Sequence, residues 1–130
     1  MNLHHSETDI TPELALRRKN TEYFIRGEIV AICNAVIGNY IEVLAAACEL
    51  NRLGFELFGE LNEGFRDFSA ICSEVDHLPI GEERQNWDLD VLAEKDKEVK
   101  KAAALYSEVI REACKPLLTT LGPYAPSLFG

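Results

Sequence analysis

Apolar residues recur at intervals of three and four through most of this chain, which is the spacing of amphipathic α-helices. The pattern holds from residue 12 to residue 37, where Thr11 supplies a hydroxyl cap and Pro12 suits the first helical position. Gly38 reads as the end of this segment, and Asn39 is placed to cap the next one. We therefore expect one long helix, or two helices with a bend, over residues 12–37.

The same spacing predicts two further helices. Residues 40–54 form the second, with an extension by about one turn left open, and residues 89–121 form the longest, capped by Asp88. Pro116 removes a hydrogen bond inside this last helix, so we expect a kink or a break close to it. The expected fold is all-α, an irregular antiparallel bundle of three to four helices in a single domain over residues 1–130.

The segment from Phe65 to Asp88 continues neither helical pattern. It contains Pro79 and Gly81 as breaks, and Trp87 is the only tryptophan of the chain. Loops of this length without secondary structure are uncommon in compact domains, and the apolar content of this one argues against disorder. We therefore expect an ordered connector over residues 65–88 that lies across the bundle.

The two ends of the chain carry less pattern. Residues 1–10 are polar, and we expect them to be frayed. The tail over residues 122–130 is proline-rich and cannot continue a helix, so its apolar side chains would fold back over the bundle or dock on a second subunit. Three helices of this length also leave part of their apolar surface uncovered in a monomer, which is compatible with a homodimer.

The net charge of −9 is concentrated in one part of the chain. Between residues 56 and 90, ten acidic residues stand against two basic ones. Nucleic-acid binding needs clustered Lys and Arg, and no apolar run approaches the ~20 residues of a membrane span, so we expect neither partner. A basic protein or a cation is the expected counterpart, although surplus acid also simply keeps small proteins soluble. The N-terminal sequence has no apolar export signal, from which we expect a cytoplasmic location.

The four cysteines are widely spaced and include no CxxC pair. They are Cys33, Cys48, Cys72 and Cys114. This spacing is not that of a zinc or redox motif. We expect reduced, structural thiols, with Cys72 in the connector as the one to test for reactivity.

The connector also holds the densest group of side chains able to bind a cation or to take part in acid–base chemistry, namely Glu74, Asp76, His77, Glu82, Glu83 and Arg84. A divalent cation needs several oxygen or imidazole ligands that converge. A bend at Pro79 and Gly81 would bring together the weak metal candidates Asp76, His77, Glu82 and Glu83. Two alternatives stay open: acid–base catalysis, or turn hydrogen bonds with the two glutamates in the first turn of a short helix.

Arg84 and Trp87 lie three positions apart, on one face of a helical turn. The guanidinium would pair with one of three carboxylates, those of Asp76, Glu83 or Asp88. The indole would anchor the connector on the bundle, with an aromatic ligand platform as the alternative. The predicted interaction and anchor residues are therefore Glu74, Asp76, His77, Arg84 and Trp87.

The run from Ser73 to Arg84, SEVDHLPIGEER, followed by Trp87 and by a helix with Asp96, Glu98 and the sequence EACK, resembles a family of small bacterial proteins of unknown function. The resemblance extends over residues 26–118, more loosely in the upstream helices. It implies a bacterial source and a helical fold. It implies no activity and no functional residue.

These observations favour a non-enzymatic, cytoplasmic protein-binding or regulatory module, similar in role to an immunity protein, that presents an acidic surface. This hypothesis requires the ten acidic residues to share one face. The alternative is a small metal-binding protein or metal-dependent hydrolase that uses the connector cluster; no other cofactor is expected. A small-molecule sensor with a pocket beside Trp87 is a third candidate.

Overall fold

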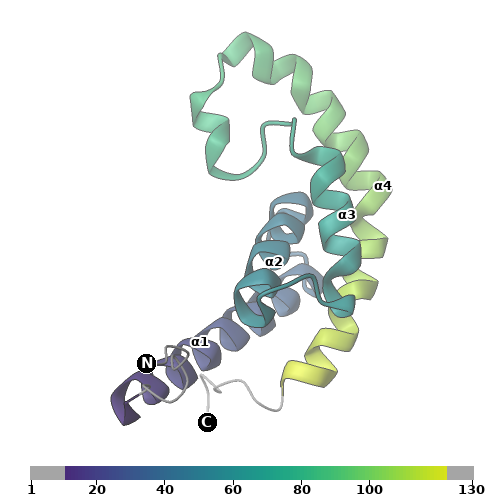
Figure 1. The fold of residues 1–130 in the computed structure, drawn as a ribbon. Helices are drawn as coiled ribbons and strands as arrows, with labels where there is room; N and C mark the ends of the chain where they lie inside the picture. Colours follow the sequence, from purple (N-terminus) through teal and green to yellow (C-terminus); the bar gives the residue numbers. More distant parts are fainter. Residues whose placement is uncertain (1–10, 123–130) are drawn as a thin grey trace.

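The computed structural model describes residues 11–122, which contain helices and no strands. There are four α-helices, α1 (Pro12–Ile37), α2 (Val43–Phe58), α3 (Arg66–Val75) and α4 (Leu89–Leu121), and two short 3-10 helices, η1 (Glu63–Phe65) and η2 (Gly81–Asn86) (Figure 1). The predicted all-α class is confirmed. The expectations for residues 1–10 and for the tail beyond Gly122 lie outside the described residues.

The start of α1 is as predicted, whereas the start of α2 is not. Thr11 Oγ1 accepts a hydrogen bond from the backbone N–H of Leu14 at 3.2 Å. The cap of α2 is Glu42 rather than Asn39, because the Glu42 carboxylate accepts hydrogen bonds from the N–H groups of Leu44 and Ala45 at 3.0 and 2.7 Å. Asn39 instead adopts the left-handed φ of 61° in the turn between the two helices.

The connector prediction is wrong for its first half. Residues 66–75 form α3, which buries Phe68, Ile71 and Val75 at helical spacing. Phe65, just before α3, is also buried, and its ring lies 6.0 Å from that of Phe68. The connector is therefore shorter than predicted. It spans residues 76–88, between α3 and α4, and contains η2.

Pro116 does not break α4, which continues to Leu121. In Figure 1 the helix follows a curved course along its whole length. The expected break is therefore wrong. Because proline has no backbone N–H, the carbonyl four residues before Pro116 receives no hydrogen bond from it. The Pro116 carbonyl accepts a hydrogen bond from the Thr120 hydroxyl (Oγ1) at 2.8 Å.

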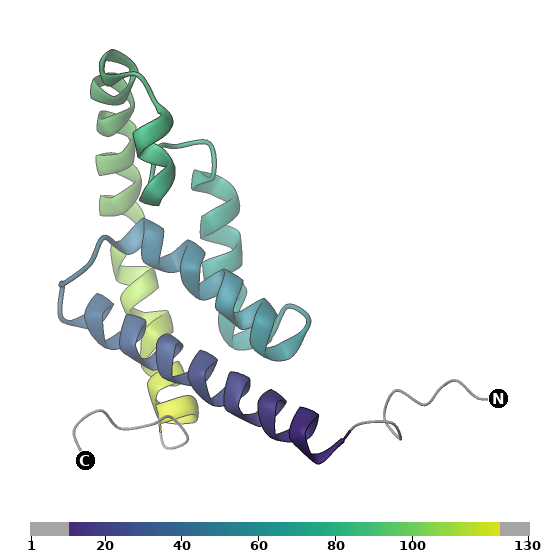
Figure 2. The same cartoon turned by 90° about the vertical axis from the view of Figure 1, so that its left-hand side faces the viewer.

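The core lies where α1, α2, α3 and α4 pack against one another. Its fully enclosed side chains include Ile29, Leu44, Leu50, Phe68 and Ile110. Two parts of the molecule project beyond this core (Figures 1 and 2). The first turns of α1 project on one side, and the first turns of α4 project with η2 on the other. No helix in the described part of the chain is long and apolar enough to cross a membrane.

Candidate functional site

A hollow lies between α2, the end of α3 and η2. Its volume is about 770 Å³, and we call it the acidic hollow. It is lined by Ala45, Cys48, Glu49, Arg52, Cys72, Asp76, Ile80, Gly81, Glu82 and Glu83. Four of these ten residues carry carboxylates and one carries a guanidinium, so the hollow has the same sign of charge as the chain as a whole.

A disulfide between Cys48 and Cys72 forms part of the wall of the acidic hollow. It joins α2 to α3 with a Cα–Cα distance of 5.0 Å. The expectation of four reduced thiols is therefore wrong for this pair. Sequence spacing could not reveal it, because the two cysteines meet only when α3 folds back along α2. Both are half-buried, so the disulfide borders the solvent in the hollow.

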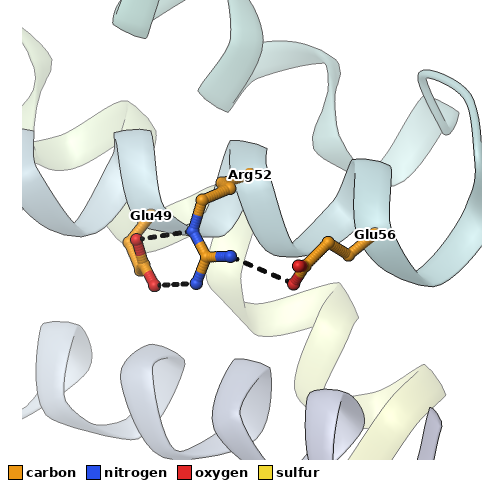
Figure 3. Close-up of polar contacts among 3 residues, drawn as sticks. All are labelled: Glu49, Arg52 and Glu56. Atoms are coloured by element: carbon orange, nitrogen blue, oxygen red, sulfur yellow. Dashed lines mark hydrogen bonds and ion pairs between the residues drawn. The ribbon is translucent and has the colours of Figure 1, made fainter. Parts of the chain in front are cut away.

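Arg52 on α2 is held by two carboxylates of its own helix. Its Nε donates to Glu49 Oε1 at 3.1 Å, and its Nη1 lies 3.1 Å from Glu56 Oε2 (Figure 3). The bond from Arg52 lowers the pKa of Glu49, which stays ionised. Sequence reasoning missed this group, although its spacing of three and four residues is a known signal for helical ion pairs.

The remaining acids of the hollow are free of such pairing. Asp76 directly follows α3, and Glu82 and Glu83 lie in the first turn of η2. All three are exposed, and none has an ion-pair partner among residues 11–122. They leave an uncompensated negative charge on one side of the hollow.

The partner of Arg84 differs from all three that we expected. Its Nη1 lies 2.6 Å from Asp96 Oδ1 on α4, and its Nη2 lies 3.3 Å from Oδ2. Nη1 also donates to the backbone carbonyl of Pro79 at 3.1 Å. The bond from Arg84 lowers the pKa of Asp96. Arg84 thus fastens η2 to α4 through a carboxylate that the sequence did not lead us to expect.

Hydrophobic anchoring of the segment comes from its proline stretch rather than from the tryptophan. Leu78, Pro79 and Ile80 are buried, the first and third as members of the core. Trp87 is only half-buried, and it is not among the side chains that pack against that core. The anchoring role expected for Trp87 is therefore taken by Leu78 and Ile80.

The four weak metal candidates do not converge. His77 lies with Glu74, Glu98 and Lys101 around a separate hollow of about 220 Å³, whereas Asp76, Glu82 and Glu83 line the acidic hollow. No group of three or more His, Cys, Asp or Glu side chains within residues 11–122 could hold a metal ion. Consecutive positions such as Asp76 and His77 point to different sides, which the sequence alone does not reveal.

The ten acidic residues between positions 56 and 90 fall into two groups at opposite ends of α3. Glu56, Glu60, Glu63 and Asp67 lie at its beginning, where α2 ends, and the other six follow Ser73. A ten-residue helix is about 15 Å long. The ten acidic residues therefore do not form one continuous face, so the hypothesis of a single acidic surface made by all ten is wrong in that form. Of the second group, Asp76, Glu82 and Glu83 line the acidic hollow.

The projecting first half of α1 is the other notable surface. Every residue from 11 to 24 is exposed, including Leu16 and Phe24, which are 58% and 69% exposed. Arg17 and Arg18 border a shallow hollow of about 310 Å³ that also includes Glu56 at the end of α2. The homodimer stays a prediction.

Comparison with known proteins adds no relative to this picture. The connector motif that resembles small bacterial proteins therefore stays an expectation from the sequence. No protein-family model, no curated protein and no solved structure matches this chain.

Proposed function

We propose that this protein is a non-enzymatic binding module that takes a basic segment of a partner protein into the acidic hollow. The observation that carries the proposal is the set of three exposed, unpaired carboxylates of Asp76, Glu82 and Glu83 around a hollow of about 770 Å³. A volume of this order is typical of sites that enclose a small ligand. Lysine or arginine side chains are the groups that would neutralise such a lining.

The walls of the acidic hollow are held from several directions. The Cys48–Cys72 disulfide joins α2 to α3, and Arg84 joins η2 to α4. Leu78 and Ile80 bury the segment between α3 and η2 in the core. A site that is already ordered loses less conformational entropy when a ligand binds, which supports recognition rather than folding on binding.

Fluorescence anisotropy with a fluorescein-labelled peptide rich in Lys and Arg tests the proposal. The triple variant D76N/E82Q/E83Q removes three charges from the hollow, and we expect it to weaken binding on the order of tenfold, since an exposed ion pair contributes ~0.2–1 kcal/mol. The matched control E60Q/E63Q/D67N removes the same charge from the other end of α3 and should bind like the wild type.

Both outcomes are informative. Binding that falls only in the hollow variant, and that weakens with added salt, supports the proposal. Equal losses in the two triple variants would mean that the peptide responds to net charge alone, and the proposal would then be wrong.

A further inference from the structure

The first half of α1 is a helix that buries none of its side chains. All residues from Pro12 to Phe24 are exposed, and the first buried side chain of the helix is that of Ile25. We call residues 12–24 the α1 overhang; a helix of this length spans about 20 Å. Isolated helices this short are only marginally stable in water, and helices in proteins gain most of their stability from packing. We therefore expect another surface to cover the overhang.

The overhang carries both apolar and basic side chains. Leu16 and Phe24 are 58% and 69% exposed. Residues 17–19, with the sequence RRK, are the only three consecutive basic residues of the chain. None of the three has an ion-pair partner in the part of the chain that the structure describes. Glu56, which borders the same shallow hollow as the two arginines, is already paired with Arg52 at 3.1 Å. The overhang therefore presents uncompensated positive charge beside exposed apolar surface.

The acidic hollow presents the opposite charge, which is also uncompensated. Asp76, Glu82 and Glu83 line it and are exposed. The two surfaces do not meet within one molecule, because the overhang and η2 project on opposite sides of the core (Figures 1 and 2). Only a second molecule can bring the basic residues of the overhang to these carboxylates.

We propose that the basic partner of the acidic hollow is a second copy of this chain, whose α1 overhang lies across the hollow. This inference rests on the binding function proposed above and names the partner. The contact joins two different surfaces of the chain, so a closed twofold dimer contains it twice, and each molecule both gives its overhang and receives that of its partner. Successive residues of a helix point about 100° apart, so a hollow with carboxylates on the end of α3 and on η2 suits the basic run better than a flat surface.

Analytical ultracentrifugation of charge-reversed full-length variants tests the pairing. The wild type should form a dimer that dissociates with added salt. R17E/R18E/K19E and D76K/E82K/E83K should each weaken the dimer on the order of tenfold or more, because each places like charges in contact. A mixture of the two variants should dimerise again, since an acidic overhang then meets a basic hollow and the two unchanged surfaces also pair.

The matched control is K97E/K100E/K101E, which reverses three exposed lysines on α4. It changes the net charge as much as R17E/R18E/K19E does and should dimerise like the wild type. Circular dichroism checks that every variant is as helical as the wild type, so that a lost dimer is not a lost fold.

The outcomes separate this inference from the function on which it rests. A wild type that stays monomeric up to about 1 mM, where even weak complexes form, would overturn the inference, as would a dimer that persists in both reversed variants or a mixture that does not dimerise. If the Lys- and Arg-rich peptide still binds the wild type and loses affinity in D76N/E82Q/E83Q, the hollow is a site for basic segments whose partner is not this chain. Loss of both the dimer and peptide binding would contradict the two proposals together.

Discussion

Arg84 and Asp96 form the one side-chain ion pair between η2 and α4 in the described part of the chain, across twelve positions of sequence. The same guanidinium nitrogen that lies 2.6 Å from the Asp96 carboxylate also donates to the Pro79 carbonyl. One side chain therefore links the buried proline stretch, η2 and the first turns of α4. Glu82 and Glu83 of the acidic hollow belong to the η2 segment that Arg84 links to α4.

Replacing Asp96 by Asn should loosen η2 without unfolding the bundle. The Arg84 guanidinium would lose its charged partner, so we expect faster amide hydrogen exchange in residues 81–88 and little change in the core of α2 and α3. Glu94→Gln is the matched control, because it removes the Glu94–Lys97 pair on the same stretch of α4 without touching η2. Unchanged exchange at residues 81–88 in D96N would show that the proline stretch alone holds η2.

The same pair predicts a pH dependence. Because Arg84 lowers the pKa of Asp96 from its ordinary value of 3.8, the ionised carboxylate favours the folded arrangement. That contribution is fully present above the ordinary pKa and is lost as the pH falls through the lowered one, below about pH 4. Trp87 directly follows η2, so its fluorescence should report a transition in this range that D96N lacks. A D96N curve identical to the wild-type curve would assign the transition to other carboxylates.

Gly54 is the residue that allows Phe65 to pack on α2. A Cβ atom at this position would lie 2.6 Å from Cδ2 and 2.7 Å from Cγ of the Phe65 ring, which is 2% exposed and has no space to move into. Gly54→Ala should therefore lower the free energy of unfolding by about 1–3 kcal/mol, despite the better helix propensity of alanine. Urea denaturation measures this. Gly122→Ala is the control, since nothing lies within 4 Å of its Cβ and its φ of −54° suits alanine.

The long helices could be predicted from the sequence, and α3 could have been. The periods of α1 and α4 extend over many turns, and the Thr11 cap is a strong local signal. The residues of α3 have the same spacing, from Phe68 to Val75, but over fewer than three turns. The proline, glycine and acidic residues that follow led us to treat the whole segment as one connector.

Tertiary contacts explain what the sequence could not reveal about the site. Cys48 and Cys72 meet through the packing of α2 on α3, and Arg84 finds Asp96 on another helix rather than a carboxylate nearby in the sequence. His77 and Asp76 are neighbours in the chain but border different hollows. In each case the sequence shows which side chains are present, but which side chains come into contact depends on how the helices pack against one another.

The unusual cap of α2 gives another prediction. Glu42 accepts hydrogen bonds from two backbone N–H groups that would otherwise lack partners at the start of the helix. Glu42→Ala should therefore cost about 1 kcal/mol in the free energy of unfolding. Glu42→Asp keeps a carboxylate at a position where Asp is among the preferred caps, so it should recover most of this loss. Equal destabilisation by Ala and Asp would show that only the longer glutamate reaches both N–H groups.

The Cys48–Cys72 disulfide should matter both for stability and for the shape of the acidic hollow. The double variant C48S/C72S opens a cross-link between residues that are 24 positions apart, so thermal denaturation should show a loss of about 3 kcal/mol. If the disulfide holds α2 and α3 at the spacing that the basic peptide requires, the variant should also bind the labelled peptide more weakly, even well below its melting temperature. C33A/C114A is the control, because that pair lies in the core and away from the hollow, so it should leave peptide affinity unchanged. A C48S/C72S protein that is less stable but binds as tightly as the wild type would show that the disulfide stabilises the fold, while Leu78, Ile80 and Arg84 suffice to keep the carboxylates in place.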